Sequence, residues 1–433
     1  MSLPAPRRAA VPKPESTRNV APCLVGCTAL VVLSRQQAPA LASHHVRPDG
    51  GLAARTDRPL ATAAVAAVGG TLFVLVRLLV AAKGDISRFV MAGRDFVNPA
   101  SAPKGLYVFP GSGYDGQFYY RLALDPVDLA KTAFGITVDA GFRLQRIGMS
   151  ALAWLASGGQ HQAVPEALVA INLAALVALA WLGALIANDA GRHAAWGLLV
   201  AGYWGFLFSI GRDLPEMLAS CFLVGGLVAL RRARPVLAGL VLSCAVLTLE
   251  TTLDVVIAVG VVALVQILRR VRRPGRQDLA WVMPGLAFVG WQVTALAMVG
   301  ALPMRSDTGD NLGVPAVNMV GAVVHYLTHI ASASSLLWLA EFFVLAIVTL
   351  FAAWSLPRSR VPVWEKAAWV VASLVAVSLA RGVWYGHATF RGFEDVYLLS
   401  SVVLIGSRHR LWLPAALVAV AWVVPFAHHV VDL

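Results

Sequence analysis

Charged residues are scarce in this chain of 433 residues. Only 13% of its residues are charged, whereas 58% are hydrophobic, and the mean hydropathy is +0.71. Soluble globular domains carry about 25% charged residues. The composition therefore excludes a soluble globular protein and indicates a polytopic membrane protein.

Cysteines and the common catalytic motifs are also rare or missing. The four cysteines match neither a disulfide framework nor a metal-binding spacing. The chain has no GxxxxGK[ST] loop, no GxSxG turn and no HExxH helix. The sequence therefore lacks the motifs that are typical of nucleotide hydrolysis, serine-hydrolase chemistry and zinc proteolysis. No internal repeat is visible, which disfavours a transporter built from duplicated halves.

Basic residues, by contrast, are in excess, and the formal net charge is +12. They occur in short clusters between apolar runs, as the positive-inside rule describes. This distribution predicts a lipid bilayer as a partner and no binding of nucleic acid. The clusters that we expect at the cytoplasmic face are residues 231–234, 269–276, 358–366 and 408–410.

Residues 1–58 differ from the rest because they are rich in Pro, Arg, Ala and Ser. Their one apolar run, 20–33, is too short for a comfortable membrane span. We favour a disordered cytoplasmic tail, and a weak signal peptide or an over-long start are the alternatives. The expected organisation is this tail followed by a transmembrane domain over residues 59–433.

The apolar runs predict an all-α fold, a polytopic bundle of transmembrane helices. The expected spans are residues 60–82, 168–186, 196–210, 217–230, 235–249, 255–268, 279–302, 336–356, 367–384, 396–406 and 411–426. The apolar helix 144–157 is expected to lie in the interface or to re-enter, because only then does every basic cluster fall inside. Residues of about 83–141 form a long first external loop, and loops of this length are usually functional.

The most distinctive stretch of that loop is GYDGQFYYRLALDP, residues 113–126. Its Asp115 lies between two glycines that permit a tight turn and a close approach to a ligand. The rings that follow suit a water–lipid boundary, so an anchoring aromatic belt is the alternative. A belt has no use for the Asp or for Gln117, and we therefore favour a functional site with Asp115, Gln117, Tyr119 and Tyr120.

Two short pairs of polar residues are expected on the same outer face. Arg143 and Arg146 share one face of a helix, so both guanidiniums could bind one phosphate, or they could reach to lipid headgroups. Asp213-x-x-Glu216 has the spacing of a capping box, with a proline in the first helical turn. A cap at the outer surface can also face a ligand.

Further candidates lie near the outer ends of later spans. Glu250 falls between two short apolar runs, where an unpaired carboxylate is costly, so we expect an Arg or hydroxyl partner. Arg391 is a candidate anion ligand next to His387, and pairing with Glu394 or Asp395 is its alternative. Polar side chains from distant parts of the chain on one face of a bundle predict a binding site.

Together these motifs resemble a known family. YDGQFYY (114–120) after the first span, Arg143-x-x-Arg146, Asp213-x-x-Glu216 and Glu250-Thr251 are similar to a group of bacterial multi-spanning proteins of cell-surface glycopolymer formation. These resemble members of the GT-C superfamily of lipid-linked-sugar glycosyltransferases. The likeness covers most of the chain from about residue 60 onward, and the Asp-Gly-Gln-Phe-Tyr-Tyr run is its most specific part.

The resemblance implies a fold and a reaction. The fold would be a bundle of about ten to thirteen helices in a bacterial inner membrane, with its site on the non-cytoplasmic face. The donor would be a sugar on a polyprenyl phosphate, and the acceptor a glycan or lipid of the cell envelope. Asp115 would act as the catalytic base, and Arg146 and Arg391 would stabilise the departing phosphate. The residues expected to bind substrate or phosphate are Gln117, Tyr119, Tyr120, Arg143, Arg146, Asp213, Glu216, Glu250, His387 and Arg391.

Two points stay open at this stage. Some relatives carry a pair of acidic residues where this chain has Asp115 alone, so the need for a divalent cation is undecided. The alternative functions are a transporter or flippase of lipid-linked saccharides and a non-catalytic relative. A transporter would depend on polar residues near the middle of the membrane, whereas the candidates here are expected at one face.

Overall fold

The computed structural model describes residues 52–305, 311–386 and 390–431, with side chains over 59–305, 311–386 and 390–423. By its internal contacts the chain divides into Met1–His45 and Val46–Leu433, and every described residue belongs to the second unit. Most of the expected tail therefore lies outside the described residues. The first described helix, α2 (Leu52–Val80), begins before the predicted boundary at residue 59.

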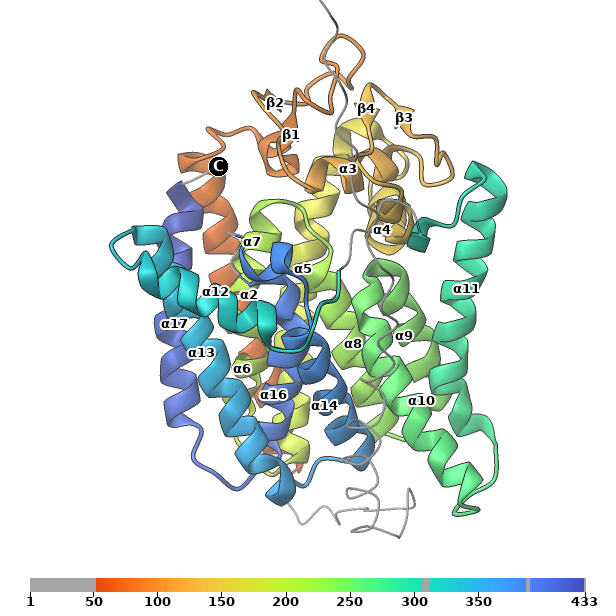
Figure 1. The fold of residues 1–433 in the computed structure, drawn as a ribbon, viewed down its shortest axis with the longest axis vertical. Helices are drawn as coiled ribbons and strands as arrows, with labels where there is room; N and C mark the ends of the chain where they lie inside the picture. Colours follow the sequence, from red (N-terminus) through yellow and green to blue (C-terminus); the bar gives the residue numbers. More distant parts are fainter. Residues whose placement is uncertain (1–51, 306–310, 387–389, 432–433) are drawn as a thin grey trace, which may run out of the picture. The chain divides into compact units, whose positions relative to one another are not determined.

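The described chain is mostly helical, and most of its longer helices run along one common direction (Figure 1). Five helices among the described residues are long and apolar enough to cross a membrane: α2, α5 (Val164–Asp189), α10 (Leu253–Leu268), α11 (Leu279–Val299) and α13 (Ala333–Ser355). A bent pair, described below, makes a sixth. A helical bundle with membrane-length apolar helices is thus confirmed, although by this criterion fewer helices cross than the resemblance implies.

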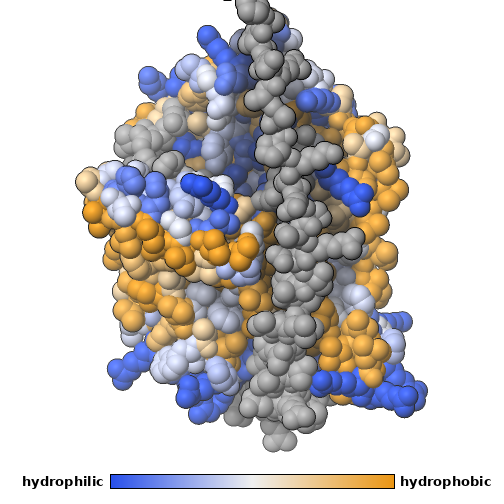
Figure 2. Space-filling view, in the orientation of Figure 1, coloured by the Kyte–Doolittle hydropathy of each residue, from blue (hydrophilic) through white to orange (hydrophobic). Residues whose placement is uncertain are grey.

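The outer surface of this bundle is apolar. Along α2 the exposed large hydrophobic side chains are Leu60, Val65, Val68, Leu72, Leu75, Leu79 and Val80. Only 28% of the apolar window of α2 and 17% of that of α11 are buried against the protein. Figure 2 shows the hydrophobic surface along the flanks and hydrophilic groups toward both ends. A soluble protein rarely exposes such a surface, whereas the hydrocarbon of a bilayer solvates it.

Several helices of the bundle are short, namely α8 (Glu216–Arg231), α9 (Pro235–Thr248), α14 (Val363–Val377) and α16 (Glu394–Ile405). At 1.5 Å per residue, α8 is about 24 Å long and α5 about 39 Å. Arg231 at the end of α8 pairs with Glu365 of α14, so the short helices meet at the end that carries the basic loops. Their opposite ends therefore stop short of the start of α5, on the side of the cap described next.

The long loop after α2 is folded, and residues 83–146 are called the cap. It contains η1 (Ile86–Val90), β1 (Ala92–Gly93), β2 (Val108–Phe109), α3 (Gly116–Leu124), β3 (Thr132–Ala133), β4 (Ile136–Thr137) and η2 (Gly141–Gln145). β1 pairs with β2 in parallel, and β3 pairs with β4 antiparallel. The two small sheets are the departure from the expected all-α fold, and Figure 1 shows them beyond the ends of the helices.

The helix that follows the cap, α4 (Ile147–Ala156), packs against α3, α5 and the outer end of α9. Its ten residues span about 15 Å, roughly half the hydrocarbon thickness of a bilayer. By length alone α4 is too short to cross, as the sequence analysis expected for residues 144–157.

One expected span is broken. In place of a continuous helix over 196–210, η4 (Ala194–Gly197) and α6 (Leu198–Ala201) meet α7 (Gly205–Gly211) at an angle of 63°. The indole N–H of Trp422 donates to the carbonyl of Gly202, 2.6 Å away. This bond replaces a helical partner that the break removes, which a break at membrane depth requires.

Two other segments differ from expectation. The span expected over 367–384 divides into α14 and α15 (Arg381–Trp384). The segment before α13 contains an unexpected helix, α12 (Val317–Thr328), which crosses the direction of the bundle in Figure 1. One stripe of α12 is apolar and exposed, through Val317, Val320, Val324 and Leu327. Such a stripe is typical of a helix that lies in a membrane interface.

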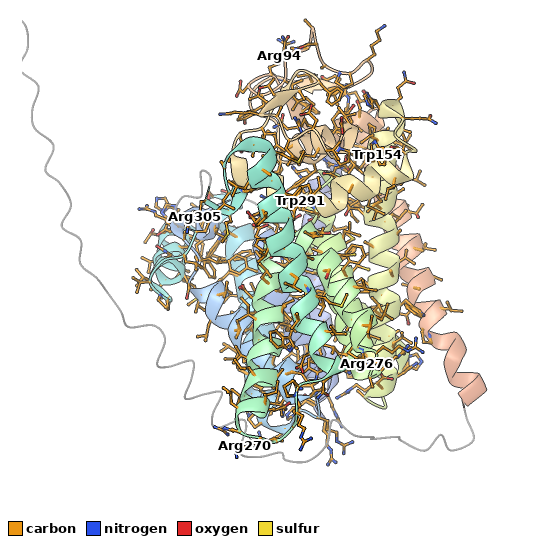
Figure 3. All side chains as sticks on the ribbon, turned by 90° about the vertical axis from the view of Figure 1, so that its right-hand side faces the viewer. Arg94, Trp154, Arg270, Arg276, Trp291 and Arg305 are labelled. Atoms are coloured by element: carbon orange, nitrogen blue, oxygen red, sulfur yellow. The ribbon has the colours of Figure 1, made fainter. Side chains whose placement is uncertain are left out.

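The loops with the basic clusters gather at the end of the bundle opposite the cap. Arg192, after α5, donates to the carbonyls of Ile405, Ser407 and His409 before α17 (Trp412–Val431). Figure 3 shows Arg270 and Arg276 at one end and Arg94 of the cap at the other. The bundle therefore has one strongly basic end and one end covered by the cap.

Candidate functional site

Two glycines allow the turn at Asp115 to pack directly against neighbouring backbone. Gly113 has a φ of +63°, and a Cβ there would lie 2.2 Å from the carbonyl oxygen of Met91. A Cβ on Gly116 would lie 2.2 Å from the carbonyl oxygen of Arg212, in the turn before α8. The close approach expected of these glycines is thus made to the protein's own backbone, and it seats the start of α3 on the bundle.

The carboxylate of Asp115 lies between two arginines. Asp115 occupies the N-cap position of α3 but makes no capping hydrogen bond. Its Oδ1 instead accepts a bond of 2.7 Å from Nη2 of Arg143 in η2, and its Oδ2 accepts one from Nη2 of Arg391 in η9 (Arg391–Phe393). Only 14% of the Asp115 side chain is exposed. Three segments that are far apart in the sequence therefore meet at one carboxylate.

Each arginine also contacts a second carboxylate. Arg143 donates to Oδ1 of Asp139 at 3.1 Å, and Nη1 of Arg391 lies 3.6 Å from Oε1 of Glu216. Burial would raise the pKa of Asp115, but Arg391 and Arg143 outweigh that effect and lower it to about 2. Asp115 is therefore ionised throughout the physiological pH range.

A second ion pair lies beside the first. The Nε and Nη2 atoms of Arg146 bind the two oxygens of Glu250 at 2.7 and 2.5 Å. The remaining Nη1 donates to the hydroxyl of Tyr119 at 3.0 Å. The expectation of an arginine partner for Glu250 is confirmed. Arg143 and Arg146 bind different carboxylates, because the 3₁₀ helix ends at Gln145 and Arg146 leaves the helical conformation.

The other candidates of the YDGQFYY motif support the cap. Gln117 is buried, accepts from the backbone N–H of Gly93 at 3.0 Å and donates to the carbonyl of Ser112 at 2.9 Å. Both ends of its amide thus join cap segments. Tyr120 is buried, and the charged group that acts on its pKa is Glu166, near the start of α5, and not an arginine of the site. The ring of Tyr114 does reach the site, with the guanidinium of Arg391 5.1 Å from its centroid.

The capping box predicted at Asp213 and Glu216 is wrong. Helix α8 begins at Glu216, and its N-cap, Pro215, makes no side-chain capping bond. Glu216 is turned toward Arg391 and also accepts a bond of 3.2 Å from the hydroxyl of Ser209. The strained backbone of Asp213, with a φ of +50°, carries its side chain away from the helix start.

Asp213 itself is fully buried. Neither of its carboxylate oxygens has a hydrogen-bond partner among the described residues. Burial raises the pKa of Asp213 well above its ordinary range, and Arg77 lowers it only in part. Burial therefore disfavours the charged form of Asp213, and its carboxyl group is not paired with Arg143 or Arg391.

The segment before Arg391 is also strained. Phe390 has a φ of +51°, which is unusual for an aromatic residue. Its carbonyl accepts a hydrogen bond from the hydroxyl of Tyr203, and its ring packs against Trp338 and Phe393. These contacts hold Arg391 on Asp115 and Glu216, so the alternative pairing with Glu394 or Asp395 does not occur. His387, the remaining candidate, lies outside the described residues.

Asp139 was not among the predicted candidates; it lies four residues before Arg143, just ahead of η2. The i, i+4 spacing of an acidic and a basic residue was the signal that could have found it. A cavity of about 580 Å³ opens beside this pair, between the cap and the end of α11. Gly141 and Leu144 of η2 line it together with Lys131 and Met298.

Within the parts of the chain that the structure describes, no group of three or more His, Cys, Asp or Glu side chains is placed to hold a metal ion. The carboxylates of the site face arginines instead. No protein family model, curated protein or solved structure matches the chain. The site itself is therefore the basis for assigning a function.

Proposed function

We propose that this protein is a membrane glycosyltransferase of the GT-C type, which transfers a sugar from a polyprenyl-phosphate donor to a glycan or lipid acceptor of the cell envelope. The reaction would take place on the extracytoplasmic face of a bacterial inner membrane. One observation carries the proposal: an ionised carboxylate, Asp115, is bound by two arginines where the cap meets the starts of the short helices α8 and α16.

The depth of the site supports a lipid-linked substrate. Glu216 and Arg391 lie at the outer starts of α8 and α16, whose lengths of about 18–24 Å compare with a hydrocarbon thickness of about 30 Å. A phosphate carried on a membrane lipid can reach such a site from the plane of the bilayer, whereas a water-soluble nucleotide would have to pass the cap. The absence of a nucleotide-binding loop from the sequence agrees with a lipid phosphate as the leaving group.

The side chains suit the reaction. The oxygen of the acceptor hydroxyl would attack the anomeric carbon of the sugar while Asp115 takes the hydroxyl proton. The bond from that carbon to the phosphate oxygen breaks, and its electron pair remains on the lipid phosphate. Fixed guanidiniums beside Asp115 would stabilise this growing negative charge. The ring of Tyr114 offers an apolar face to the sugar.

The distribution of basic residues supports the proposed orientation. The four arginine-rich loops lie at the end of the bundle opposite the cap, and Figure 3 shows this for Arg270 and Arg276. Under the positive-inside rule that end faces the cytoplasm. The cap and the site would then face outward.

A second candidate, a transporter or flippase of lipid-linked saccharides, is favoured by other observations. The bend between α6 and α7 resembles the broken helices of many transporters. Glu341 of α13 and Glu394 of α16 are each only 2% exposed inside the bundle. A transporter would move the lipid-linked sugar without breaking its bond to phosphate. A non-catalytic relative would tolerate loss of Asp115.

The test is sugar transfer from a panel of synthetic polyprenyl-phosphate sugars in purified membranes. Wild type is compared with Asp115→Asn and with Asp278→Asn, at matched expression. Asp278 pairs with Arg272 near the basic loops, so its variant makes the same chemical change far from the site. We expect transfer by wild type and Asp278→Asn and a loss of about 10²–10⁴-fold in Asp115→Asn. Equal rates in all three would remove Asp115 from catalysis, and movement of intact donor without transfer would favour the transporter.

A further inference from the structure

We propose that Arg143 and Arg391 form the phosphate-binding pair of the site, and that Asp115 occupies this pair as an internal anion until a lipid phosphate replaces it. The inference rests on the proposed function, which it deepens by naming the two ligands and the competition between substrate and base. The ligand class is a phosphate group on a membrane lipid.

The geometry of the pair suits a phosphate. Arg143 and Arg391 bind the two oxygens of one carboxylate, and Arg143 also binds Asp139 through Nε and Nη2. A phosphate also presents adjacent oxygens to guanidinium forks, and it carries more charge than a carboxylate. Nη1 of Arg391 is buried and has no hydrogen-bond partner among the described residues, although Glu216 lies 3.6 Å away. That N–H is available for a further phosphate oxygen.

Arg146 is a poorer ligand than the resemblance implied. Three of its nitrogens already bind partners, two on Glu250 and one on the hydroxyl of Tyr119. Moving Arg146 to a phosphate would leave the carboxylate of Glu250 without its partner at the end of the membrane helices, which is costly. We therefore assign Arg146 a positioning role, in which it holds Tyr119 and α3 against the bundle.

Asp115, in contrast, is free to exchange its partners. In the described part of the chain its carboxylate accepts hydrogen bonds from the two guanidiniums alone, with no backbone N–H or neutral side chain to hold it. Arg143 and Arg391 can therefore bind a phosphate in place of the Asp115 carboxylate, and no turn or helix cap is broken. The carboxylate that they release stays beside the phosphate, where a base for the acceptor hydroxyl is needed.

The exchange would change the strength of the base. While both arginines bind it, the pKa of Asp115 is about 2, and so weak a base removes a hydroxyl proton poorly. Loss of both guanidiniums and the arrival of a negative phosphate both raise the pKa of Asp115. The base would thus become effective when the donor is bound.

The experiment measures the affinity of sugar-free polyprenyl phosphate for purified protein in lipid nanodiscs. The variants are Asp115→Asn, Arg143→Gln, Arg391→Gln and, as a matched control, Asp139→Asn. We expect Asp115→Asn to bind about tenfold more tightly than wild type, because no internal anion competes for the arginines. The two arginine variants should bind at least about tenfold more weakly. Asp139→Asn also frees Arg143 of a carboxylate but leaves Asp115 on both arginines, so any gain in affinity should be smaller than the gain in Asp115→Asn.

Two results would overturn the proposal. Binding by Asp115→Asn that is unchanged or weaker than in wild type would mean that the carboxylate does not compete. Equal strengthening in Asp115→Asn and Asp139→Asn would show a general effect of charge in place of an exchange.

A measurement on wild type alone guards against misfolded variants. A water-soluble carbodiimide modifies protonated carboxyl groups, and peptide mass spectrometry reads the modified residue. At pH 5.5, addition of polyprenyl phosphate should increase labelling of Asp115 at least about threefold, because its pKa rises. Asp278 is the internal reference and should not change. Unchanged or reduced labelling of Asp115 contradicts the exchange.

The exchange and the proposed function can fail separately. Suppose that Asp115→Asn binds lipid phosphate more tightly but no donor in the panel supports transfer. This result would support the exchange of anions and contradict the glycosyltransferase activity. Suppose instead that transfer requires Asp115 but Asp115→Asn binds lipid phosphate as wild type does. This result would support the glycosyltransferase activity and contradict the exchange of anions.

Discussion

The arginine–carboxylate pairs at the two ends of the bundle differ in what else holds the carboxylate. At the basic end, Asp278 accepts from Arg272 and also from the backbone N–H of Gly275 and the indole of Trp281. Where the cap meets the bundle, Asp115 is bound by two guanidiniums from segments 28 and 276 residues away. A carboxylate that closes a turn cannot leave without opening it. One that is held only by cations can exchange them for another anion.

A second pair near the basic loops makes the same contrast. Nε and Nη2 of Arg231 bind both oxygens of Glu365 at 2.5 and 2.6 Å, and the Glu365 side chain is fully buried. The pair joins α8 to α14, where it has no access to a ligand. We therefore expect substitutions at the basic end to change stability and substitutions under the cap to change transfer.

The largest expected effect is on transfer in Arg391→Gln. Removing one of the two cations beside the reacting phosphate should lower the maximal transfer rate by about 10²–10³-fold. Asp115 keeps Arg143, so the protein should still fold. Arg231→Gln is the control from the other end, and its folded fraction should transfer at close to the wild-type rate. A wild-type transfer rate in Arg391→Gln would contradict a role of this ion pair in transfer.

The same two variants should rank in the opposite order for stability. Arg231→Gln leaves Glu365 buried without its partner, so the free energy of unfolding in detergent should fall by about 3–5 kcal/mol. Arg391→Gln should cost less, because Asp115 and Glu216 are nearer to solvent and Asp115 retains a cation. Denaturant titration of both proteins measures the difference. Equal losses would mean that both pairs are structural.

A smaller effect is expected where the cap meets the bundle. In Gly116→Ala, the new Cβ would lie 2.2 Å from the carbonyl oxygen of Arg212, so α3 must move away. We expect a loss of about 1–3 kcal/mol in stability together with slower transfer. Gly275→Ala in the turn at the basic end is the control, because no atom lies within 4 Å of its added Cβ. Thermal unfolding and transfer assays on both variants test this, and a neutral Gly116→Ala would contradict the close packing.

The smallest effect is the acid dependence of stability. The folded pKa of Asp115, about 2, lies below its unfolded value of about 4. The ion pairs of Asp115 therefore add stability that is complete above pH 4 and disappears as the pH falls toward 2. Thermal unfolding from pH 5 to pH 3 should show a shallower decline in Asp115→Asn than in wild type. Parallel declines would show that the arginines do not stabilise ionised Asp115.

Much of the fold could be predicted because apolar runs are local. The predicted spans at 60–82 and 168–186 correspond to α2 and α5, since the hydrocarbon of a bilayer requires only length and hydrophobicity. The break between α6 and α7 could not be predicted, because the apolar run continues through it. The Trp422 indole that binds the Gly202 carbonyl at the break lies 220 residues along the chain.

The site was predictable in its chemistry but not in its pairing. Asp115 and Arg391 were recognised because charged residues next to membrane spans are rare and costly. Which carboxylate each arginine binds depends on contacts between distant segments. Local spacing predicted a cap at Asp213, and the structure instead buries that side chain and turns Glu216 to Arg391. Asp139 was the exception, because its spacing from Arg143 carried the information.

The sequence by itself determined that this is a helical, membrane-type chain with basic loops at alternating turns and one polar loop centred on Asp115. Hydrophobicity and charge act residue by residue, so they can be read without coordinates. Only the tertiary structure decided that the loop folds into a cap and that its carboxylate lies between Arg143 and Arg391. Ion pairs between segments up to 276 residues apart follow from the packing of short helices beneath that cap, which no local pattern encodes.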